Sequence, residues 1–446
     1  MKPIIEPEFY KDFHCIGGQC SFTCCKEWKI AVDPETKKRW RKLSVPETVL
    51  ESGRVPKHAC RSSLDKAQLS QFVMKKDGGE IIELLPNMRC PFLEDTELCR
   101  LVLDYGEACL SETCHVFPRE THEFADRTER TLVSCCPEIV DRLYALKELH
   151  FTNLPYQDRV FLLEGKDKLF QIRNIMMYWL SDVSASNEVN LKRTFFMLLD
   201  LLEKEKKAES AADAVKALDP GECLKEADVK KLTEMMLAMP KDAQASIEEQ
   251  NALFLDITEN YRKEGRYQGL LNPLYAMAEQ LSREFQEADA ARMDVVCALH
   301  AKVVVAYAPL LRNYLVAEAF ATLLIPGCTL RDMVLQLEWM IMEYVLIVHA
   351  MVLEILCKKD VPGTSNSKED AGDAMPSSES QSSFNGRTYA AVAETVNAPL
   401  AYPKARELLI LIARMTGYDG DEIEEYLRDS FENPVWPWGY ADYLLA

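Results

Sequence analysis

The amino-acid sequence predicts a mainly α-helical protein, in which a cysteine-rich module with a small β-hairpin precedes a large helical bundle. Eleven of the 15 cysteines fall within the first 150 residues. From about Asn153 onward, apolar residues instead recur at the three- and four-residue spacing of amphipathic helices. We therefore expect a cysteine-rich metal or iron–sulfur module over residues 1–150 and a helical domain over residues 151–446.

The composition indicates a soluble globular protein. The chain has 446 residues, which is enough for two to three domains. Its net charge of −19 is unevenly spread, with −3 in residues 1–150 and −16 in the remainder. Such an acidic surface disfavours unguided binding to nucleic acid or to anionic lipid.

The chain lacks the pattern of a secretion signal or a membrane span. Charges at Lys2 and Glu6 come too early for the apolar region of a signal peptide. The most apolar helix candidate, Leu330–Cys357, contains five charged residues and is therefore expected to be a buried bundle helix. These observations favour the cytoplasm, where closely spaced cysteines bind metal more often than they form disulfides.

Short elements are expected in the cysteine-rich module. Phe72–Lys76 and Glu80–Leu85 flank Asp77-Gly78-Gly79, which is the pattern of a β-hairpin. Trp28–Val32 is a candidate for another short strand. The following Asp33-Pro34-Glu35 has the residues of a helix cap and first turn.

Helices dominate the remainder of the chain. The two longest and most apolar segments are expected to form the core of the bundle. Residues 360–388 are rich in Ser, Gly, Pro and acidic residues and are predicted to be a disordered insertion. The aromatic residues of Phe431–Ala446 are expected to anchor the tail to the core. The predicted helices are Val160–Ser181, Asn190–Lys206, Leu224–Met239, Ala243–Glu264, Met293–Leu324, Thr329–Lys358, Tyr389–Thr395 and Lys404–Thr416.

The cysteines of the module occur mainly in four short groups. Thiolates suit zinc and iron–sulfur clusters, and both alternatives stay open from spacing alone. Four ligands complete either site, so some cysteines must be buried apolar residues, additional ligands or redox partners. The scattered Cys223, Cys297, Cys328 and Cys357 are expected in the helical core. The groups are Cys15-x4-Cys20-x3-Cys24-Cys25, Cys90 with Cys99, Cys109-x4-Cys114, and Cys135-Cys136.

These motifs resemble the bacterial flagellin lysine-N-methylase family. Their combined order is more specific than any single motif, and the resemblance covers residues 8–140 closely and the helical part more loosely. The insertion at 360–388 and the cysteines Cys60, Cys109 and Cys135 depart from it. The matching stretches are Phe13-His14-Cys15-Ile16-Gly17 through Cys20, Thr23-Cys24-Cys25 with Trp28, Cys90-Pro91-Phe92-Leu93, Cys99, Cys114 through Phe117-Pro118-Arg119, and Cys136-Pro137-Glu138.

The resemblance implies S-adenosylmethionine-dependent N-methylation of lysine side chains on flagellin. It also implies an iron–sulfur cluster, expected to be of the 4Fe–4S type, held by cysteines. The first-rank ligands that it implies are Cys20, Cys24, Cys90, Cys99, Cys114 and Cys136, and the second-rank ligands are Cys15 and Cys25.

The sequence gives partial information about the chemistry. No G-x-G-x-x-G turn is present, so a Rossmann-type donor site is not expected. Cys20-x3-Cys24 matches the first half of a radical C-x3-C-x2-C motif, but position 27 is Glu27. Arg119 is a candidate contact for a cofactor carboxylate, or for a salt bridge between module and helical domain. No catalytic base is assigned, although Tyr105, Tyr307, Tyr314 and Glu343 are candidates.

Two histidines adjoin the cysteines. His115 and His14 are each a candidate ligand or a hydrogen-bonding neighbour of a ligand.

Two further functions remain open. A zinc-stabilised adaptor for protein partners would bind zinc and transfer no methyl group. An iron–sulfur redox protein would be bleached reversibly by dithionite, also without methyl transfer.

Overall fold

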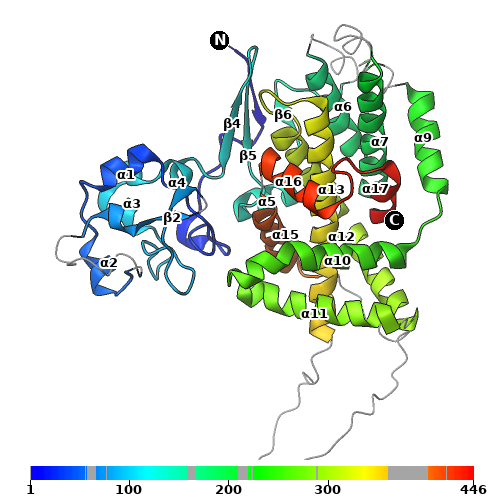
Figure 1. The fold of residues 1–446 in the computed structure, drawn as a ribbon. Helices are drawn as coiled ribbons and strands as arrows, with labels where there is room; N and C mark the ends of the chain where they lie inside the picture. The colour runs from blue at the N-terminus through cyan, green and yellow to red at the C-terminus, as the bar shows by residue number, and fades with distance from the viewer. Residues whose placement is uncertain are drawn as a thin grey trace, which may run out of the picture.

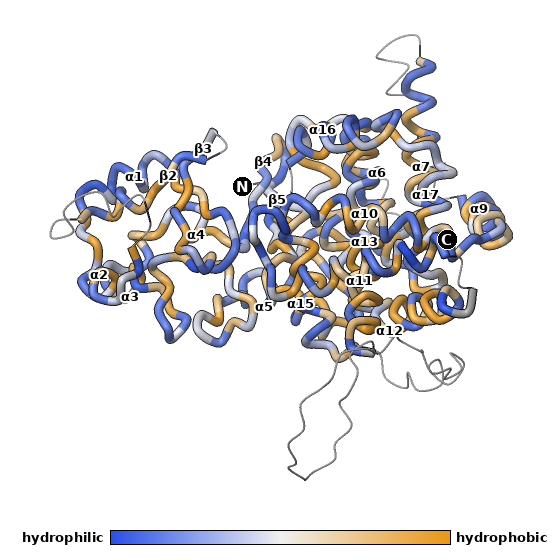
Figure 2. Tube along the Cα trace, turned by 60° about the horizontal axis from the view of Figure 1, so that its bottom comes forward, coloured by the Kyte–Doolittle hydropathy of each residue, from blue (hydrophilic) through white to orange (hydrophobic). Residues whose placement is uncertain are grey.

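The structure, a computed structural model, describes residues 2–55, 57, 67–76, 78–158, 167–208, 219, 221, 225–287, 290–359, 400–417 and 419–446. Most of these residues are helical, as expected for a mainly α protein. Figures 1 and 2 show from two directions a small lobe beside a large helical body, with β4, β5 and α5 between them.

The small lobe is built from short helices around a hairpin. The predicted hairpin is confirmed, since β2 and β3 pair in antiparallel register with Val73 opposite Ile82. The predicted cap is also confirmed, because the Asp33 carboxylate accepts a hydrogen bond from the amide of Thr36. Segment 30–32 pairs with β3 through two backbone hydrogen bonds. The elements are α1 (Pro34–Trp40), α2 (Glu47–Glu51), β2 (Val73–Lys76), β3 (Gly79–Ile82), α3 (Arg100–Tyr105) and α4 (Glu112–Val116).

The lobe has its own apolar core, contributed by residues between Ile30 and Cys109. Trp40, Phe72 and Phe92 are fully buried there, and the Phe92 ring packs against both of the other rings. The Trp40 indole donates a hydrogen bond of 2.8 Å to the carbonyl of Cys109. This core holds the cysteine-bearing loops in fixed positions around it.

A four-stranded sheet lies between the lobe and the helical body. Its strand order is β4-β5-β1-β6, and β1 runs parallel to β5 but antiparallel to β6. Ile5, Leu132 and Phe151 from these strands belong to the core of the helical body. The division of the chain at residue 150 stays a prediction. The strands are β1 (Ile4–Pro7), β4 (Arg119–Glu123), β5 (Thr128–Leu132) and β6 (Phe151–Thr152).

The helical body surrounds α13, which is buried along most of its length. The predicted helices α7, α10, α12, α13 and α15 are confirmed to within a few residues, and the described parts of α6 and α9 match as well. The expected insertion at 360–388 and the helix at Tyr389–Thr395 lie outside the described residues. The helices are α5 (Pro137–Ala145), α6 (Lys168–Leu180), α7 (Asn187–Lys206), α9 (Glu226–Ala238), α10 (Ala243–Lys263), α11 (Gln268–Glu287), α12 (Ala290–Thr322), α13 (Leu330–Lys359), α15 (Tyr402–Met415), α16 (Gly420–Ser430) and α17 (Trp438–Leu444).

Two helices are long and apolar enough to cross a membrane by length and composition. Among the described residues they are Arg292–Thr322 and Leu330–Lys358, and 89% of the most apolar 18-residue window of the second helix lies buried inside the protein. That burial is the property of a core helix, as the charged residues of this segment led us to expect.

The C-terminal tail packs on the body through its aromatic residues, as predicted. Trp436 is 2% exposed and contacts the rings of Phe431 and Tyr440. The Trp438 indole donates a hydrogen bond of 3.3 Å to the carbonyl of Lys192. Ring packing and this hydrogen bond together fix the tail against α7.

Candidate functional site: two groups of thiols and a buried carboxyl group

Two cysteines from distant segments lie side by side in the lobe. The carbonyl of Cys25 accepts a hydrogen bond of 2.8 Å from the amide of Cys90. Lys26 and Arg89 continue this pairing as an antiparallel bridge. The amide of Cys25 donates to the hydroxyl of Thr23 at 3.2 Å. The backbone therefore fixes the first cysteine group next to the second.

A tight turn brings Cys99 back beside the same strand. Leu93 and Cys99 form an antiparallel bridge, and the amide of Arg100 donates to the carbonyl of Phe92 at 2.8 Å. The turn passes through Glu97, whose φ of 58° lies in the left-handed region. Cys99 then lies immediately before α3, so one short loop presents both Cys90 and Cys99.

Cys114 completes this set of thiols from the start of α4. The Ser111 hydroxyl caps the helix and accepts a hydrogen bond of 3.3 Å from the amide of Cys114. Burial raises the pKa of Cys114 to about 12, and the neighbouring thiols of Cys25 and Cys99 add to the shift. Burial likewise raises the pKa of Cys90, with Cys25, Cys114 and Cys99 adding to it. We call Cys25, Cys90, Cys99 and Cys114 the lobe thiols.

A second group lies where the lobe meets the helical body. Burial raises the pKa of Cys136 to about 11, and the nearby thiols of Cys20 and Cys15 add to this effect. The Cys15 sulfur accepts a hydrogen bond of 3.5 Å from the amide of Gly17. We call Cys15, Cys20 and Cys136 the junction thiols. Cys136 directly precedes α5, which anchors it to the body.

The structure thus divides the cysteines named from the sequence between two places. Cys24 lies beside the lobe thiols, since its side chain forms a hydrogen bond with Cys25. This hydrogen bond is the largest cause of the raised pKa of Cys25, and burial is the second. Cys60 and Cys223 lie outside the described residues. Among the residues that are described, no three His, Cys, Asp or Glu side chains converge closely enough to hold a single metal ion.

Glu27, at the position where a radical motif would carry a third cysteine, anchors the lobe to the body. Its φ is 60°, and its amide donates to the carbonyl of Met88 at 2.7 Å. Its carboxylate accepts a hydrogen bond of 2.9 Å from the amide of Tyr267, and its carbonyl accepts one of 2.6 Å from Arg266. These contacts tie the cysteine loop to the turn between α10 and α11.

Arg414, which sequence reasoning missed, fixes the loop that carries Cys24 and Cys25. Its guanidinium donates to the carbonyls of Phe22 at 2.8 Å, Thr23 at 3.1 Å and Cys135 at 3.2 Å. It also lies 4.5 Å and 4.9 Å over the rings of Phe22 and Trp28. A lone arginine within the apolar run of α15 was the available signal in the sequence.

The residues expected near the cofactor lie on the junction side. The Arg119 guanidinium donates to the carbonyl of Phe13 at 3.2 Å and lies 4.9 Å over the Phe13 ring. Its described contacts are thus with a loop carbonyl and a ring rather than with a carboxylate. His14 contacts the carbonyl of Asp12 at 3.3 Å, and His115 is exposed on α4.

Two of the four candidate bases meet in the helical body. The Tyr314 hydroxyl donates to one carboxylate oxygen of Glu343 at 3.2 Å, and the Thr416 hydroxyl donates to the other at 2.5 Å. Burial raises the pKa of Glu343, and the charge of Glu318 raises it further. The other two candidates have structural partners, since Tyr105 and Tyr307 donate to the carbonyls of Ser44 and Leu400.

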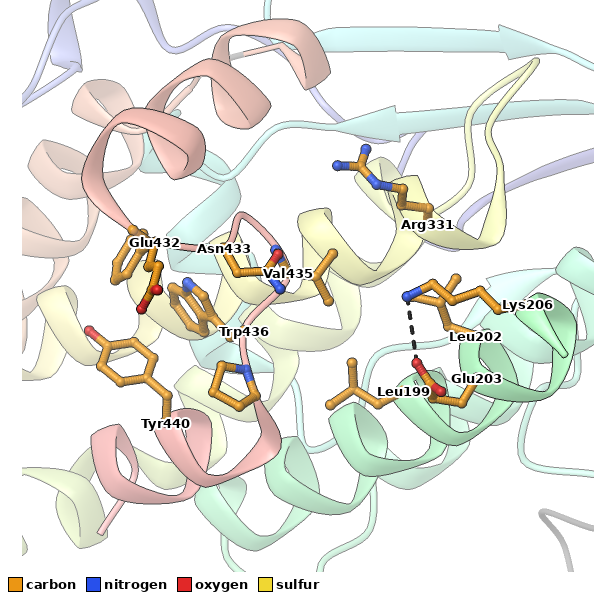
Figure 3. Close-up of a pocket in the computed structure, with 12 residues that line it drawn as sticks. Leu199, Leu202, Glu203, Lys206, Arg331, Glu432, Asn433, Val435, Trp436 and Tyr440 are labelled. Atoms are coloured by element: carbon orange, nitrogen blue, oxygen red, sulfur yellow. Dashed lines mark hydrogen bonds and ion pairs between the residues drawn. The ribbon is translucent and has the colours of Figure 1, made fainter.

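A cavity of about 960 Å³ lies elsewhere, between α7, the start of α13 and the tail segment 431–440. Figure 3 shows Trp436 and Tyr440 on one side of it, with Arg331 and Lys206 on the other. Arg331 pairs with Glu424 at 3.1 Å and Lys206 with Glu203 at 3.5 Å. The cavity therefore offers mainly aromatic and aliphatic surface.

The fold and the site together define the class of protein. It is mainly helical, and its N-terminal third gathers thiols at two places. Over 143 residues, the chain is 32% identical to the flagellar biosynthetic protein FliU of Salmonella muenchen, covering 31% of this chain and 76% of that protein. It is also 32% identical to the lysine-N-methylases of Salmonella choleraesuis and Salmonella typhimurium, again over 143 residues. The chain therefore belongs to the flagellar protein family that contains FliU and these lysine-N-methylases.

The match to the two lysine-N-methylases spans about a third of their length, 32% of each, and 31% of this chain. No family model and no solved structure matches the chain. The family resemblance predicted from the cysteine motifs is thus confirmed, whereas the iron–sulfur cluster stays a prediction.

Proposed function

We propose that this protein is a protein-lysine N-methyltransferase that acts on flagellin with S-adenosylmethionine as the methyl donor, and that the lobe thiols hold an iron–sulfur cluster. Relatives named lysine-N-methylase support the reaction. The observation that carries the cluster is the convergence of Cys25, Cys90, Cys99 and Cys114 from three separate segments onto one small core.

Four thiolates complete an iron–sulfur cluster and also complete a tetrahedral zinc site. The lobe thiols offer that number and lie near enough to act on one another's pKa. The resemblance to the flagellin lysine-N-methylase family favours the cluster. When bound, a cluster would supply a redox couple and a cross-link between three segments.

The reaction places demands that the chain's own residues must meet. Methyl transfer to lysine forms an N–C bond as the C–S bond of the donor breaks, and it requires a neutral amine. A free lysine has a pKa of about 10.4, so a group near the amine must accept its proton. Arg119 supplies a cation beside the Phe13 carbonyl, and Glu343 supplies a buried carboxyl group in the helical body. Arg119 remains our candidate for the donor's carboxylate, because it has five N–H donors in a planar fork.

The location follows from the same chemistry. Thiolate-held clusters persist in reducing compartments, so we place the protein in the cytoplasm. The acidic surface, with a net charge of −19, fits a protein substrate and disfavours nucleic acid.

The proposed reaction is tested by incubating anaerobically purified, full-length protein with flagellin and a deuterated-methyl donor, followed by mass spectrometry of the flagellin peptides. We expect label on lysine side chains, and none on flagellin whose lysines have been acetylated beforehand. Unlabelled flagellin after incubation with iron-loaded protein would contradict the proposed reaction and favour an adaptor or redox protein.

A further inference from the structure

We infer that the cavity between α7, α13 and the tail binds an N-acylated apolar amino acid through its carboxylate, its side chain and its acyl oxygen. This inference goes beyond the proposed methylation and does not rest on it. The cavity measures about 960 Å³, which is the size of a site for a small organic ligand. All of its lining residues belong to the helical body and the tail, so it is separate from both groups of thiols.

The aromatic wall of the cavity is fixed before any ligand binds. The amide of Trp436 donates to the Glu338 carboxylate at 2.8 Å, and the Tyr440 hydroxyl donates to Glu249 at 2.7 Å. The rings of Trp436 and Tyr440 meet edge to face, with their centroids 4.9 Å apart. Figure 3 shows Leu199 of α7 across the cavity from these rings. An apolar side chain would therefore enter a preformed apolar space, which lowers the ordering cost of binding.

The Trp436 indole carries a buried N–H group that lacks an acceptor. Trp436 is 2% exposed, and its Nε1 atom reaches no hydrogen-bond partner among the described residues. The indoles of Trp40 and Trp339, which are also buried, each donate to a backbone carbonyl at 2.8 Å. Buried indole N–H groups normally have such a partner. Because Trp436 lines the cavity, an acceptor oxygen of a ligand would complete its hydrogen bonding.

Two cations lie across the cavity from the aromatic rings (Figure 3). Arg331 pairs with Glu424 through one Nη atom at 3.1 Å. A guanidinium has five N–H donors in a planar fork, so Arg331 can also bind a carboxylate. Lys206 pairs with Glu203 at 3.5 Å, and both side chains are 56% exposed. An exposed pair of this kind is weak, so Lys206 is available to an incoming anion.

The arrangement of these groups favours one class of ligand. A cationic ligand would face Arg331 and would leave the Trp436 N–H group without an acceptor. The two acids at the rim, Glu203 and Glu432, are exposed, so water and salt screen their charges. Arg331 and Trp436 lie on opposite sides of the cavity, so the ligand needs a carboxylate for the first and a separate acceptor oxygen for the second. An N-acylated apolar amino acid has both, joined by an apolar side chain.

Calorimetric titration of the full-length protein with N-acetylphenylalanine tests the site. We expect saturable binding, and the amide derivative, which lacks the carboxylate, should bind about tenfold or more weakly, the scale of one charged hydrogen bond. Arg331→Gln should remove this preference for the carboxylate. Arg428→Gln is the matched control, since Arg428 pairs with the same Glu424 at 3.0 Å but is not among the lining residues. It should bind like the wild type.

Phenylpropionate tests the indole separately, because it keeps the ring and the carboxylate but has no acyl oxygen. Trp436→Phe removes the N–H group and should weaken the binding of N-acetylphenylalanine several-fold, while phenylpropionate binds as before. Thermal unfolding identifies a variant that fails to fold. Arg331→Gln changes a side chain that is 37% exposed, so it decides if Trp436→Phe does not fold.

Three results would overturn the site: no saturable binding of N-acetylphenylalanine, equal binding of its amide, or a wild-type preference for the carboxylate in Arg331→Gln. A short peptide that ends in phenylalanine, with a free or an amidated C-terminus, distinguishes the sources of the ligand. Binding of the free-acid peptide alone would assign the site to the C-terminus of a protein chain. Binding of N-acetylphenylalanine without the peptide would assign it to a free N-acyl amino acid.

Discussion

The amide of Cys90 donates a 2.8 Å hydrogen bond to the carbonyl of Cys25, and this contact joins two cysteine groups that are far apart in the sequence. Neither of these two cysteine groups contains all four lobe thiols. The hydrogen bond, the Leu93–Cys99 bridge and the Ser111 cap together bring the four cysteines close enough for their thiols to act on one another's pKa. The proposed cluster follows from this assembly rather than from any single motif.

The assignment of the lobe thiols is tested by iron content. Cys90→Ser should lower bound iron about tenfold or more, since it removes a direct ligand and even outer contacts of metal ligands matter on that scale. Iron and sulfide analysis of anaerobically purified protein measures this. Cys297→Ser on α12, a partly buried site against the main core, is the control and should retain all of its iron. Loss of iron in Cys15→Ser but not in Cys90→Ser would move the cluster to the junction thiols.

Arg414 should stabilise the joint between the cysteine loop and α15. Arg414→Ala removes three hydrogen bonds to carbonyls and the stacking on Phe22 and Trp28. Charged hydrogen bonds of this kind suggest a loss of about 2–4 kcal/mol in the free energy of unfolding, measured in urea. Arg428→Ala removes only an exposed pair with Glu424 and should cost under about 0.5 kcal/mol. Equal effects of the two variants would argue against this role.

Glu129 should be required to neutralise two buried arginines. It accepts hydrogen bonds from Arg127 at 2.5 Å and from Arg173 at 3.0 Å, and Arg173 is fully buried. Glu129→Ala leaves the buried Arg173 without its carboxylate partner and leaves Arg127 with only Asp126 and Asp167, which should cost about 3–5 kcal/mol of stability by chemical denaturation. Asp126→Ala removes the exposed partner of Arg127 and should cost under about 1 kcal/mol.

The same pair gives a pH dependence. Although burial opposes it, Arg173 holds the pKa of Glu129 below its ordinary value, so the pair stabilises the fold above that ordinary value. This contribution is lost as the pH falls through the lowered pKa. The wild type should therefore lose more stability than Glu129→Ala between pH 6 and acid pH. Parallel acid curves for the two proteins would contradict this linkage.

Glu338 should make the protein less stable at alkaline pH. Burial raises the pKa of Glu338 to about 8 from an ordinary value of 4.5, so the folded state binds this proton more tightly than the unfolded state. Stability from this group is complete below pH 4.5 and is lost as the pH rises through 8. Glu338→Gln should reduce the decline in stability between pH 5 and 9 by an amount on the order of a few kcal/mol, and the buried Glu343 should account for part of the decline that remains. Thermal unfolding across this range measures it, and an unchanged slope would count against the assigned pKa.

Local patterns in the sequence predicted much of the helical body. Periodicity located α7 and α10 because each has an apolar face, and nearly continuous apolar character located α13, which is buried on almost every side. It missed α11, where Pro273 interrupts the pattern inside the helix. It also missed the sheet, because Ile4–Pro7 is too short to show alternation and pairs in parallel with a strand over a hundred residues away.

The site was only partly predictable for a related reason. Spacing identified the cysteines, and residue type identified Tyr314 and Glu343 as candidate bases. The grouping of the thiols depends on a left-handed backbone conformation at Glu27 and Glu97. Glutamate seldom adopts this conformation, so the residue type does not indicate it. The carboxyl group depends on which faces of α12 and α13 meet, which no periodicity reveals.

The central claim is tested most directly by the absorption spectrum of the anaerobically purified wild-type protein, recorded together with iron, sulfide and zinc analysis. A thiolate-held cluster predicts broad absorption near ~400 nm with stoichiometric iron and sulfide, bleached by dithionite. Colourless protein with one equivalent of zinc would contradict the proposed cluster and indicate a structural metal site.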